Sequence, residues 1–175
     1  MSYDNPRDDA GISLIELIVY VMLTSIILIA TSMILINSLN TQKDVTSVSE
    51  ATNRGQSMGS TIERAMRNAL DFEVSADQQE LRVRTSLGGA QQCQAFYLAP
   101  GTARLAQSAG ALPGLPASWT AWNEGVKKNG ATPFFAQTGQ SVVYTFDIET
   151  ESAPVRFAGE ASTRSTPTGV SSPCW

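Results

Sequence analysis

The sequence predicts an α+β protein in which a long N-terminal helix packs on a small antiparallel β-sheet head. Two observations predict this class. Residues 12–36 form one uninterrupted apolar run with the length and character of a membrane-spanning helix. From residue 72 onward, the apolar residues no longer recur every three or four positions but alternate, which is typical of strands. The chain has 175 residues, enough for one domain in addition to a membrane segment.

The apolar run reads ISLIELIVYVMLTSIILIATSMILI and contains neither Pro nor Gly. As a helix it spans roughly 37 Å, more than the hydrocarbon core of a bilayer, which is about 30 Å thick. The apolar part of a secretory signal is only about 7–15 residues long, and no A-x-A cleavage site follows the run. A retained transmembrane helix is therefore the better interpretation. Lys and Arg are not biased to one flank, so charge sets no orientation.

Glu16 is the only charged residue within the run. A carboxylate at the centre of a bilayer costs about 2.5–3.5 kcal/mol, and an ionisable residue inside a membrane is by default a hypothesis for a functional site. No Lys or Arg occurs in residues 12–42, so a cation for Glu16 has to come from another chain or from a new amino terminus. The alternative is a protonated or snorkelling side chain without a role.

The string GISLIEL, from Gly11 to Leu17, resembles the cleavage and methylation motif of type IV prepilins. In that family a short polar leader ends in Gly, a membrane-embedded peptidase cuts after it, and the new first residue is N-methylated. That residue is usually Phe, followed by Thr or Ser, Leu, an aliphatic residue and Glu. Residues 13–16 match this pattern, whereas Ile12 replaces the usual Phe and the leader is acidic. The resemblance covers about the first forty residues.

The resemblance implies that residues 1–11 are a leader, that the peptidase cuts between Gly11 and Ile12, and that Ile12 becomes methylated. Cleavage would create an amino-terminal cation four residues before Glu16, on the same helical face. In filaments of the family this carboxylate is thought to neutralise the terminus of a neighbouring subunit. Glu16 would then act in assembly and not in catalysis.

The protein that the resemblance implies is a structural subunit of a type IV pilus-like filament used for adhesion, motility, secretion or DNA uptake. Many major pilins carry a Pro in the apolar segment. Residues 7–99 here contain none, which favours a minor pilin or a type II secretion pseudopilin of the W or J type. The implied partners are other pilin or pseudopilin subunits, the prepilin peptidase, the inner-membrane assembly platform and membrane lipid. The implied location is the inner membrane, with one span and an extracytoplasmic head; no cofactor is implied.

Two alternatives stay open: an uncleaved, single-span, membrane-anchored binding domain with an extracytoplasmic head, and an enzyme with a signal anchor. The chain has no His, which excludes Ser-His-Asp and Cys-His nucleophiles and histidine metal sites, and nothing beyond scattered carboxylates favours an enzyme. A net charge of -4 argues against nucleic acid as the main partner. The candidates for a local basic patch, interpreted as solvated surface charges, are Arg82, Arg84, Lys127 and Lys128.

The chain is predicted to divide into the leader, a transmembrane and assembly helix at residues 12–40, an amphipathic half of the same helix at residues 41–71, and a head at residues 72–175. Gly55 and Gly59 interrupt the amphipathic half, where they indicate flexibility or close packing. Strands are expected at 72–74, 81–84, 95–98 and 142–148, with a weaker one at 155–157 and a short helix around 119–128.

Cys93 and Cys174 are the only cysteines, too few for an all-cysteine zinc site. An exported head favours a disulfide, which would tie the C-terminal tail to the sheet and contribute about 4 kcal/mol in the chain-entropy model. The alternative is two unrelated thiols. Trp119 and Trp122 are interpreted as core residues of the head in preference to an exposed aromatic surface for a partner.

Overall fold

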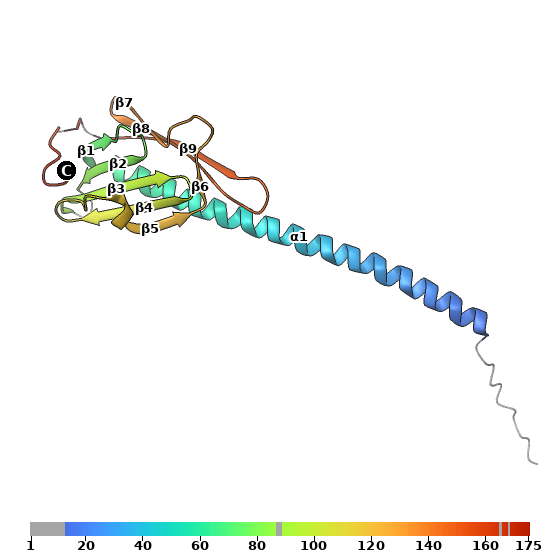
Figure 1. The fold of residues 1–175 in the computed structure, drawn as a ribbon. Coiled ribbons are helices and arrows are strands. Elements are labelled where there is room, and N and C mark those ends of the chain that lie inside the picture. Colours follow the sequence, from blue (N-terminus) through green and yellow to red (C-terminus); the bar gives the residue numbers. More distant parts are fainter. Residues whose placement is uncertain (1–12, 87–88, 165, 168) are drawn as a thin grey trace, which may run out of the picture. The chain divides into compact units, whose positions relative to one another are not determined.

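The computed structural model describes residues 13–86, 89–164, 166–167 and 169–175, so Gly11 and Ile12 lie outside the described residues. It confirms the α+β class: the described chain holds one long helix, α1 (Leu14–Arg67), followed by nine strands (Figure 1). The chain divides into two compact units between Lys43 and Asp44, and α1 contributes residues to both.

Helix α1 is 54 residues long and contains no Pro. Glu16 lies in its first turn, and Arg64 and Arg67 lie in its last, which complements the helix macrodipole at both ends. The helix ends four residues before the predicted position, residue 71, because the chain from Ala69 onward pairs with the next strand. The side-chain amide of Asn68 donates to the carbonyl oxygen of Arg64 at 2.7 Å and so satisfies a carbonyl of the last turn.

The first sheet is an antiparallel meander of five strands in chain order, drawn from green to yellow in Figure 1. Gly101 adopts φ 91° in the turn between the third and fourth strands, a conformation that favours glycine. The strands are β1 (Ala69–Val74), β2 (Glu80–Thr85), β3 (Gln92–Ala99), β4 (Thr102–Ser108) and β5 (Thr120–Glu124).

The second sheet has four strands and is organised around the long strand β8 (Ser141–Ile148). Along its whole length β8 pairs with β9 (Val155–Ser162). It also pairs with β7 (Phe135–Thr138) near its start and with β6 (Val126–Lys127) near its end. All these pairings are antiparallel. The head is therefore built from two antiparallel sheets, which together contain more strands than the five expected from the sequence.

The prediction of a helix around residues 119–128 is wrong. A short 3-10 helix (Pro116–Ser118) precedes this segment, which itself forms β5 and β6. Gly125 separates the two strands with φ 71°. Its N–H donates to the carbonyl oxygen of Gly101 at 3.1 Å, and its own carbonyl accepts from the N–H of Glu149 at 2.8 Å. Because Gly125 is bonded to the turn between β3 and β4 and to the residue that follows β8, tertiary contacts decide the conformation here and override local propensity.

The core of the head lies between the sheets and the second half of α1. Its buried helix residues recur at spacings of three and four, so one face of the helix enters the core. They are Ala51, Gly55, Met58, Gly59, Ile62, Ala65 and Met66. The strands contribute most of the large side chains, and four phenylalanines, Phe96, Phe134, Phe135 and Phe146, are among the largest fully buried residues.

Candidate functional site: the exposed apolar helix and Glu16

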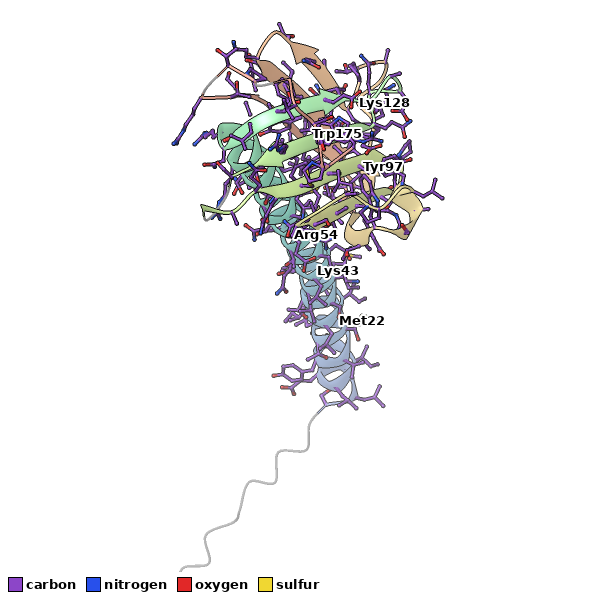
Figure 2. The ribbon with its side chains drawn as sticks, turned by 90° about the vertical axis from the view of Figure 1, so that its left-hand side faces the viewer. Met22, Lys43, Arg54, Tyr97, Lys128 and Trp175 are labelled. Atoms are coloured by element: carbon purple, nitrogen blue, oxygen red, sulfur yellow. A yellow bond between two sulfur atoms is a disulfide. The ribbon has the colours of Figure 1, made fainter. Side chains whose placement is uncertain are left out.

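The first part of α1 exposes its apolar side chains in every direction. All residues from Ser13 to Thr46 are exposed, and Met22, whose side chain projects freely in Figure 2, is 63% exposed. The most apolar 18-residue window of α1 has a mean hydropathy of 2.4, and 0% of it is buried. An apolar helix at the centre of a soluble domain would be buried. This segment therefore has the length and composition of a membrane span and lacks a protein cover within the described chain.

Glu16 lies within this exposed segment and has one side-chain partner there. The hydroxyl of Tyr20, one turn further along α1, donates to Oε1 of Glu16 at 3.3 Å. The ion pairs of the described residues all lie between Glu50 and Arg156, and none of them involves Glu16. The structure therefore agrees with the sequence that Glu16 has no cation within its own described segment.

Three hydroxyl groups of the apolar segment bond to backbone carbonyls of the helix that carries them. Thr24 Oγ1 donates to the carbonyl oxygen of Tyr20 at 2.6 Å, Ser25 Oγ to that of Val21 at 2.7 Å, and Thr31 Oγ1 to that of Ile27 at 2.9 Å. Each bond links a side chain to a residue four positions earlier, the usual arrangement for Ser and Thr in membrane helices. These hydroxyls need no outside partner and are compatible with lipid.

The second half of α1 contacts the second sheet through two glycines. A Cβ placed on Gly55 would overlap the ring of Phe157, and one placed on Gly59 would lie 2.8 Å from the hydroxyl oxygen of Tyr144. Of the two interpretations of these glycines, flexibility or close packing, the structure shows close packing. Gly159 of β9 also adjoins Tyr144, so the ring of Tyr144 lies against the backbone of two glycines.

Tyr144 and Glu63 join the sheet to the helix by a hydrogen bond. Tyr144 Oη donates to Glu63 Oε1 at 2.9 Å, and the other carboxylate oxygen of Glu63 pairs with Arg67 at 3.0 Å. Burial raises the pKa of Tyr144 above its usual value of about 10, and the bond to the Glu63 carboxylate adds to the shift. The open groove beside this pair, about 220 Å³, is lined by Gly55, Gln56, Gly59, Ser60, Glu63, Tyr144, Phe157 and Ala158.

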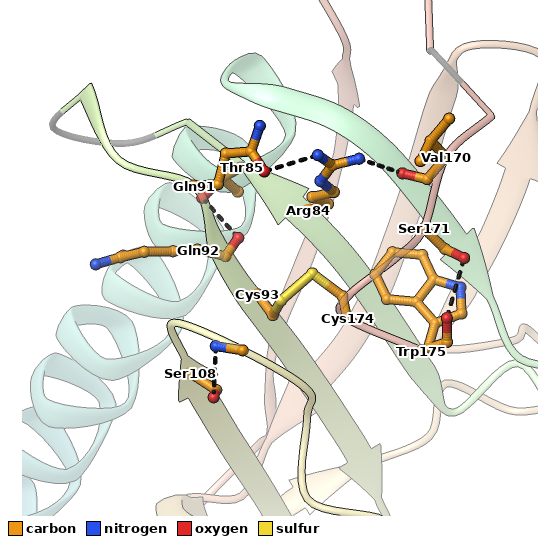
Figure 3. Close-up of a disulfide and its surroundings, with 11 residues drawn as sticks. Arg84, Thr85, Gln91, Gln92, Cys93, Ser108, Val170, Ser171, Cys174 and Trp175 are labelled. Carbon is orange, nitrogen blue, oxygen red and sulfur yellow. Dashed lines mark hydrogen bonds between the residues drawn. A yellow bond between two sulfur atoms is a disulfide. The ribbon is translucent and has the colours of Figure 1, made fainter.

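The predicted disulfide between Cys93 and Cys174 is confirmed, with 5.4 Å between the two Cα atoms (Figure 3). It joins β3 to the C-terminal tail. The tail is also held by Arg84, whose Nη1 donates to the carbonyl oxygen of Val170 at 2.6 Å, and by Leu112, whose N–H donates to the carbonyl oxygen of Cys174 at 3.0 Å. These contacts fix the C-terminal tail, whose described residues after β9 form no further helix or strand, to β2 and β3.

Of the four candidates for a basic patch, three have protein partners. Arg82 pairs with Glu80, and this hydrogen bond is the main cause of the raised pKa of Arg82. Lys127 Nζ lies 2.6 Å from Glu149 Oε1. Arg84 bonds to the tail and to Gln91, whereas Lys128 is exposed. These partners compete with phosphate for the cations. That nucleic acid is not the main partner stays a prediction.

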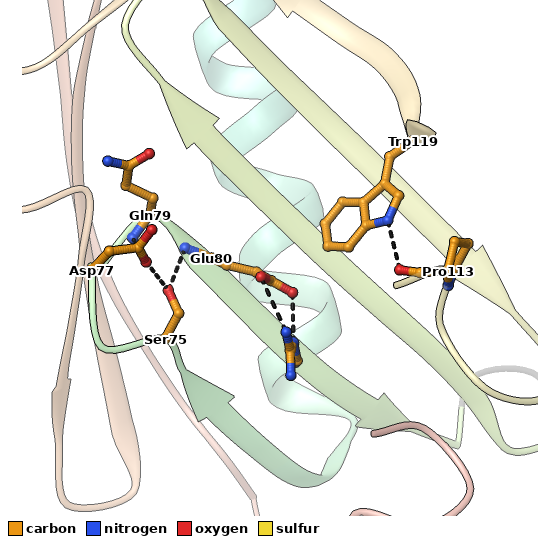
Figure 4. A network of polar contacts seen from close by, with 7 residues as sticks. Ser75, Asp77, Gln79, Glu80, Pro113 and Trp119 are labelled. Carbon is orange, nitrogen blue, oxygen red and sulfur yellow. Dashed lines mark hydrogen bonds and ion pairs between the residues drawn. The ribbon is translucent and has the colours of Figure 1, made fainter. Parts of the chain in front are cut away.

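Both tryptophans of the 119–122 region belong to the head's packed interior. Trp119 is 5% exposed and packs in a small cluster with Ala95 and Ala106, and its indole N–H donates to the carbonyl oxygen of Pro113 at 2.9 Å (Figure 4). Trp122 is partly buried, and its ring centroid lies 5.5 Å from that of Phe96. The interpretation of these residues as core is confirmed.

Among the described residues, no group of three or more Asp, Glu or Cys is placed to hold a metal ion.

Comparison with protein-family models, curated proteins and solved structures finds no match for this chain. The functional reading therefore depends on the prepilin-like string and on the geometry of α1. Sequence reasoning found Glu16 but missed Tyr20, which lies at the i+4 spacing that brings helical side chains together. It likewise missed the bond from Tyr144 to Glu63, which are 81 positions apart and carry no local signal.

Proposed function

We propose that the chain is a structural subunit, a minor pilin or a secretion pseudopilin, of a type IV pilus-like filament. The observation that carries the proposal is an apolar helix with Glu16 in its first turn and with none of its most apolar window buried by the described chain. A lone membrane anchor needs the apolar surface but has no use for a carboxylate within it. A subunit that packs its helix against other subunits has a use for both.

In this proposal prepilin peptidase removes residues 1–11 by cutting between Gly11 and Ile12, and Ile12 is then methylated. Both residues lie outside the described part of the chain, and their roles come from the resemblance of the string to the prepilin motif. Before assembly the subunit resides in the inner membrane, with its helix in lipid and its head on the extracytoplasmic side. The assembly platform then transfers it into the filament.

Glu16 supplies the driving force for correct placement in the filament. A carboxylate in lipid is costly, and the amino terminus of a neighbouring helix offers a compensating cation. At low dielectric such a pair strongly favours the register that brings the two charges together. A disulfide-bonded head fits an oxidising compartment outside the cytoplasm.

Removal of the Glu16 carboxylate tests the proposal in the host that makes this chain. We expect Glu16→Ala to abolish or strongly reduce recovery of the subunit in sheared filaments, while the membrane-inserted, processed form accumulates to the normal level. Glu50→Ala is the matched control, because Glu50 lies on the same helix but is paired with Arg54 in the head unit. Normal incorporation of the Glu16→Ala chain would contradict the proposal.

The mature amino terminus separates a filament subunit from an uncleaved, membrane-anchored binding domain. Mass spectrometry of the protein from membranes should find a chain that begins with methylated Ile12. An intact Met1 would favour the membrane-anchored domain, since its anchor functions without processing.

A further inference from the structure

We propose that Tyr20 is a positioning residue for Glu16. Its hydroxyl orients the Glu16 carboxylate toward the amino-terminal ammonium group of a neighbouring subunit and offers that group a second acceptor. The inference rests on the proposed function. It adds to that function a residue that neither the prepilin-like string nor the charge pattern identifies.

The geometry of the pair leaves room for a third group. Tyr20 Oη lies 3.3 Å from Glu16 Oε1, which is longer than the roughly 2.7–2.8 Å common for O–H···O bonds. An ionised carboxylate has about four acceptor positions, and a tyrosine hydroxyl that donates one hydrogen bond still accepts others. Both side chains are exposed on the same face of α1, one turn apart. The pair therefore presents two acceptors, of which one is charged, to a donor from outside the helix.

The absence of basic side chains from the apolar segment indicates the chemistry of this donor. Residues 12–42 contain no Lys or Arg, so a neighbour with the same segment has no side-chain cation at this depth. After cleavage its amino terminus is a cation that begins the same segment, four residues before its own Glu16. A methylated terminus carries two N–H groups, which match one carboxylate oxygen and the hydroxyl oxygen of Tyr20. The occupant is thus a secondary ammonium group on a neighbouring helix.

The polar residues of the segment cluster on the side that carries this pair. At 100° per residue, Ser13, Glu16, Tyr20, Thr24 and Thr31 fall within a sector of about 80°. Ser25 and Ser32 fall outside this sector, and the hydroxyl of Ser25 bonds to the carbonyl oxygen of Val21. Polar residues of membrane helices usually face other helices and not lipid. The sector that contains Glu16 and Tyr20 is therefore the side on which the neighbouring helix packs.

The experiment measures association of the processed chain, residues 12–175, in phosphatidylcholine vesicles by energy transfer between labelled copies. The quaternary head group of this lipid has no N–H donor, so lipid cannot replace the amino terminus. Each chain is compared with a free and with an acetylated amino terminus. The variants are Tyr20→Phe, Glu16→Gln and the double variant. Thr24→Val is the matched control, since it removes a hydroxyl from the same face that already bonds to its own helix.

We expect the free-terminus chain to associate more tightly than the acetylated one. Tyr20→Phe should weaken this terminus-dependent association by about three- to tenfold, which lies within the range for hydrogen bonds between membrane helices. Thr24→Val should stay within about twofold of the parent chain. In the Glu16→Gln background the Tyr20→Phe change should have a smaller effect, because the carboxylate that Tyr20 positions is then absent and only its own acceptor contact is lost.

Two results would overturn the role of Tyr20 alone: unchanged association of the Tyr20→Phe chain, or an equal loss in its free and acetylated forms, which would indicate packing by the ring. A parent chain whose association does not depend on its free terminus would contradict the pairing of Glu16 in the proposed function, and this inference with it. The two failures are therefore distinguishable.

Discussion

A single added methyl group at Gly55 should destabilise the head, although it improves the helix. Gly55 lies in the second half of α1 directly against the ring of Phe157, and a Cβ at this position would overlap the Cε2 and Cζ atoms of that ring. The ring also stacks with that of Phe146, with 5.4 Å between the ring centroids. A movement of the Phe157 ring away from the helix would disturb this contact.

Two opposing effects decide the magnitude. Replacing Gly by Ala inside a helix stabilises it by about 1 kcal/mol. Overpacking a core costs about 1–3 kcal/mol, and loss of the Phe146–Phe157 contact adds about 0.5–1.5 kcal/mol. The net expectation for Gly55→Ala is a loss of about 0.5–3.5 kcal/mol in the free energy of unfolding, or roughly 2–14 °C in Tm at about 4 °C per kcal/mol for a head of this size.

Thermal unfolding of the full chain in a mild detergent, followed by tryptophan fluorescence, measures the effect. Gly110→Ala is the control, because a Cβ at Gly110 meets no atom within 4 Å. The double variant Gly55→Ala/Phe157→Ala should be more stable than the sum of the two single losses predicts, since removal of the ring relieves the overlap. A Gly55→Ala chain as stable as the parent, or more stable, would refute the close-packing argument.

Two further predictions concern the head. Because the pKa of Tyr144 is raised in the folded state, the unfolded chain loses this proton first as pH rises through about 10, and stability falls. The stability is fully present below that pH. Urea unfolding at pH 8 and 10.5 should show a smaller loss for Tyr144→Phe than for the parent; equal losses would contradict the assignment. Removing the disulfide by Cys93→Ser/Cys174→Ser should cost about 4–5 kcal/mol, given a sequence separation of 81. Unfolding in urea without reductant tests it, and an unchanged midpoint would show that the bridge constrains little.

The parts of the fold that the sequence predicts are those with a strong local period. The long apolar run, the amphipathic continuation and the alternation in β2, β3 and β8 each identify their element from neighbouring residues. The weakly patterned β9 was also expected, at 155–157, although it extends from Val155 to Ser162. The helix boundary differed by four residues because the pairing of β1 with β2 competes with helix for the same residues.

Strands β4 to β7 were missed because their signals are weak or nonlocal. β4 reads TARLAQS, in which two alanines dilute the alternation, and β6 contains only Val126 and Lys127. Their existence depends on partners far along the chain: β6 pairs with residues 147 and 148 of β8. No residue near Val126 in the sequence indicates that pairing, so local propensity alone favoured a helix there.

Only the charged residue of the candidate site was predicted from the sequence. The absence of a cation near Glu16 indicated the amino terminus as its partner. It gave no indication of Tyr20, which is a neutral hydrogen-bond donor. The spacing of four residues on a helix was a sufficient signal for this contact. The contacts that fix the head on α1, Phe157 on Gly55 and Tyr144 on Gly59, had no such signal, because each joins residues from distant parts of the chain.

The two parts of α1 differ in what covers their apolar side chains, and this difference supports the proposed assembly. From Ala51 onward the apolar face of α1 is covered by the strands of its own head, whereas nineteen large hydrophobic side chains between Leu14 and Val45 are exposed. Leaving them in water would cost on the order of tens of kcal/mol, more than the 5–15 kcal/mol that typically holds a domain together. Lipid or other helices have to cover them. Lipid satisfies every one of these side chains but does nothing for Glu16, whereas a neighbouring subunit covers the same apolar surface and also brings an ammonium group to Glu16 and Tyr20. In the proposed function, the hydrophobic surface would keep the subunit in the membrane, and the carboxylate would favour its transfer from lipid into a filament.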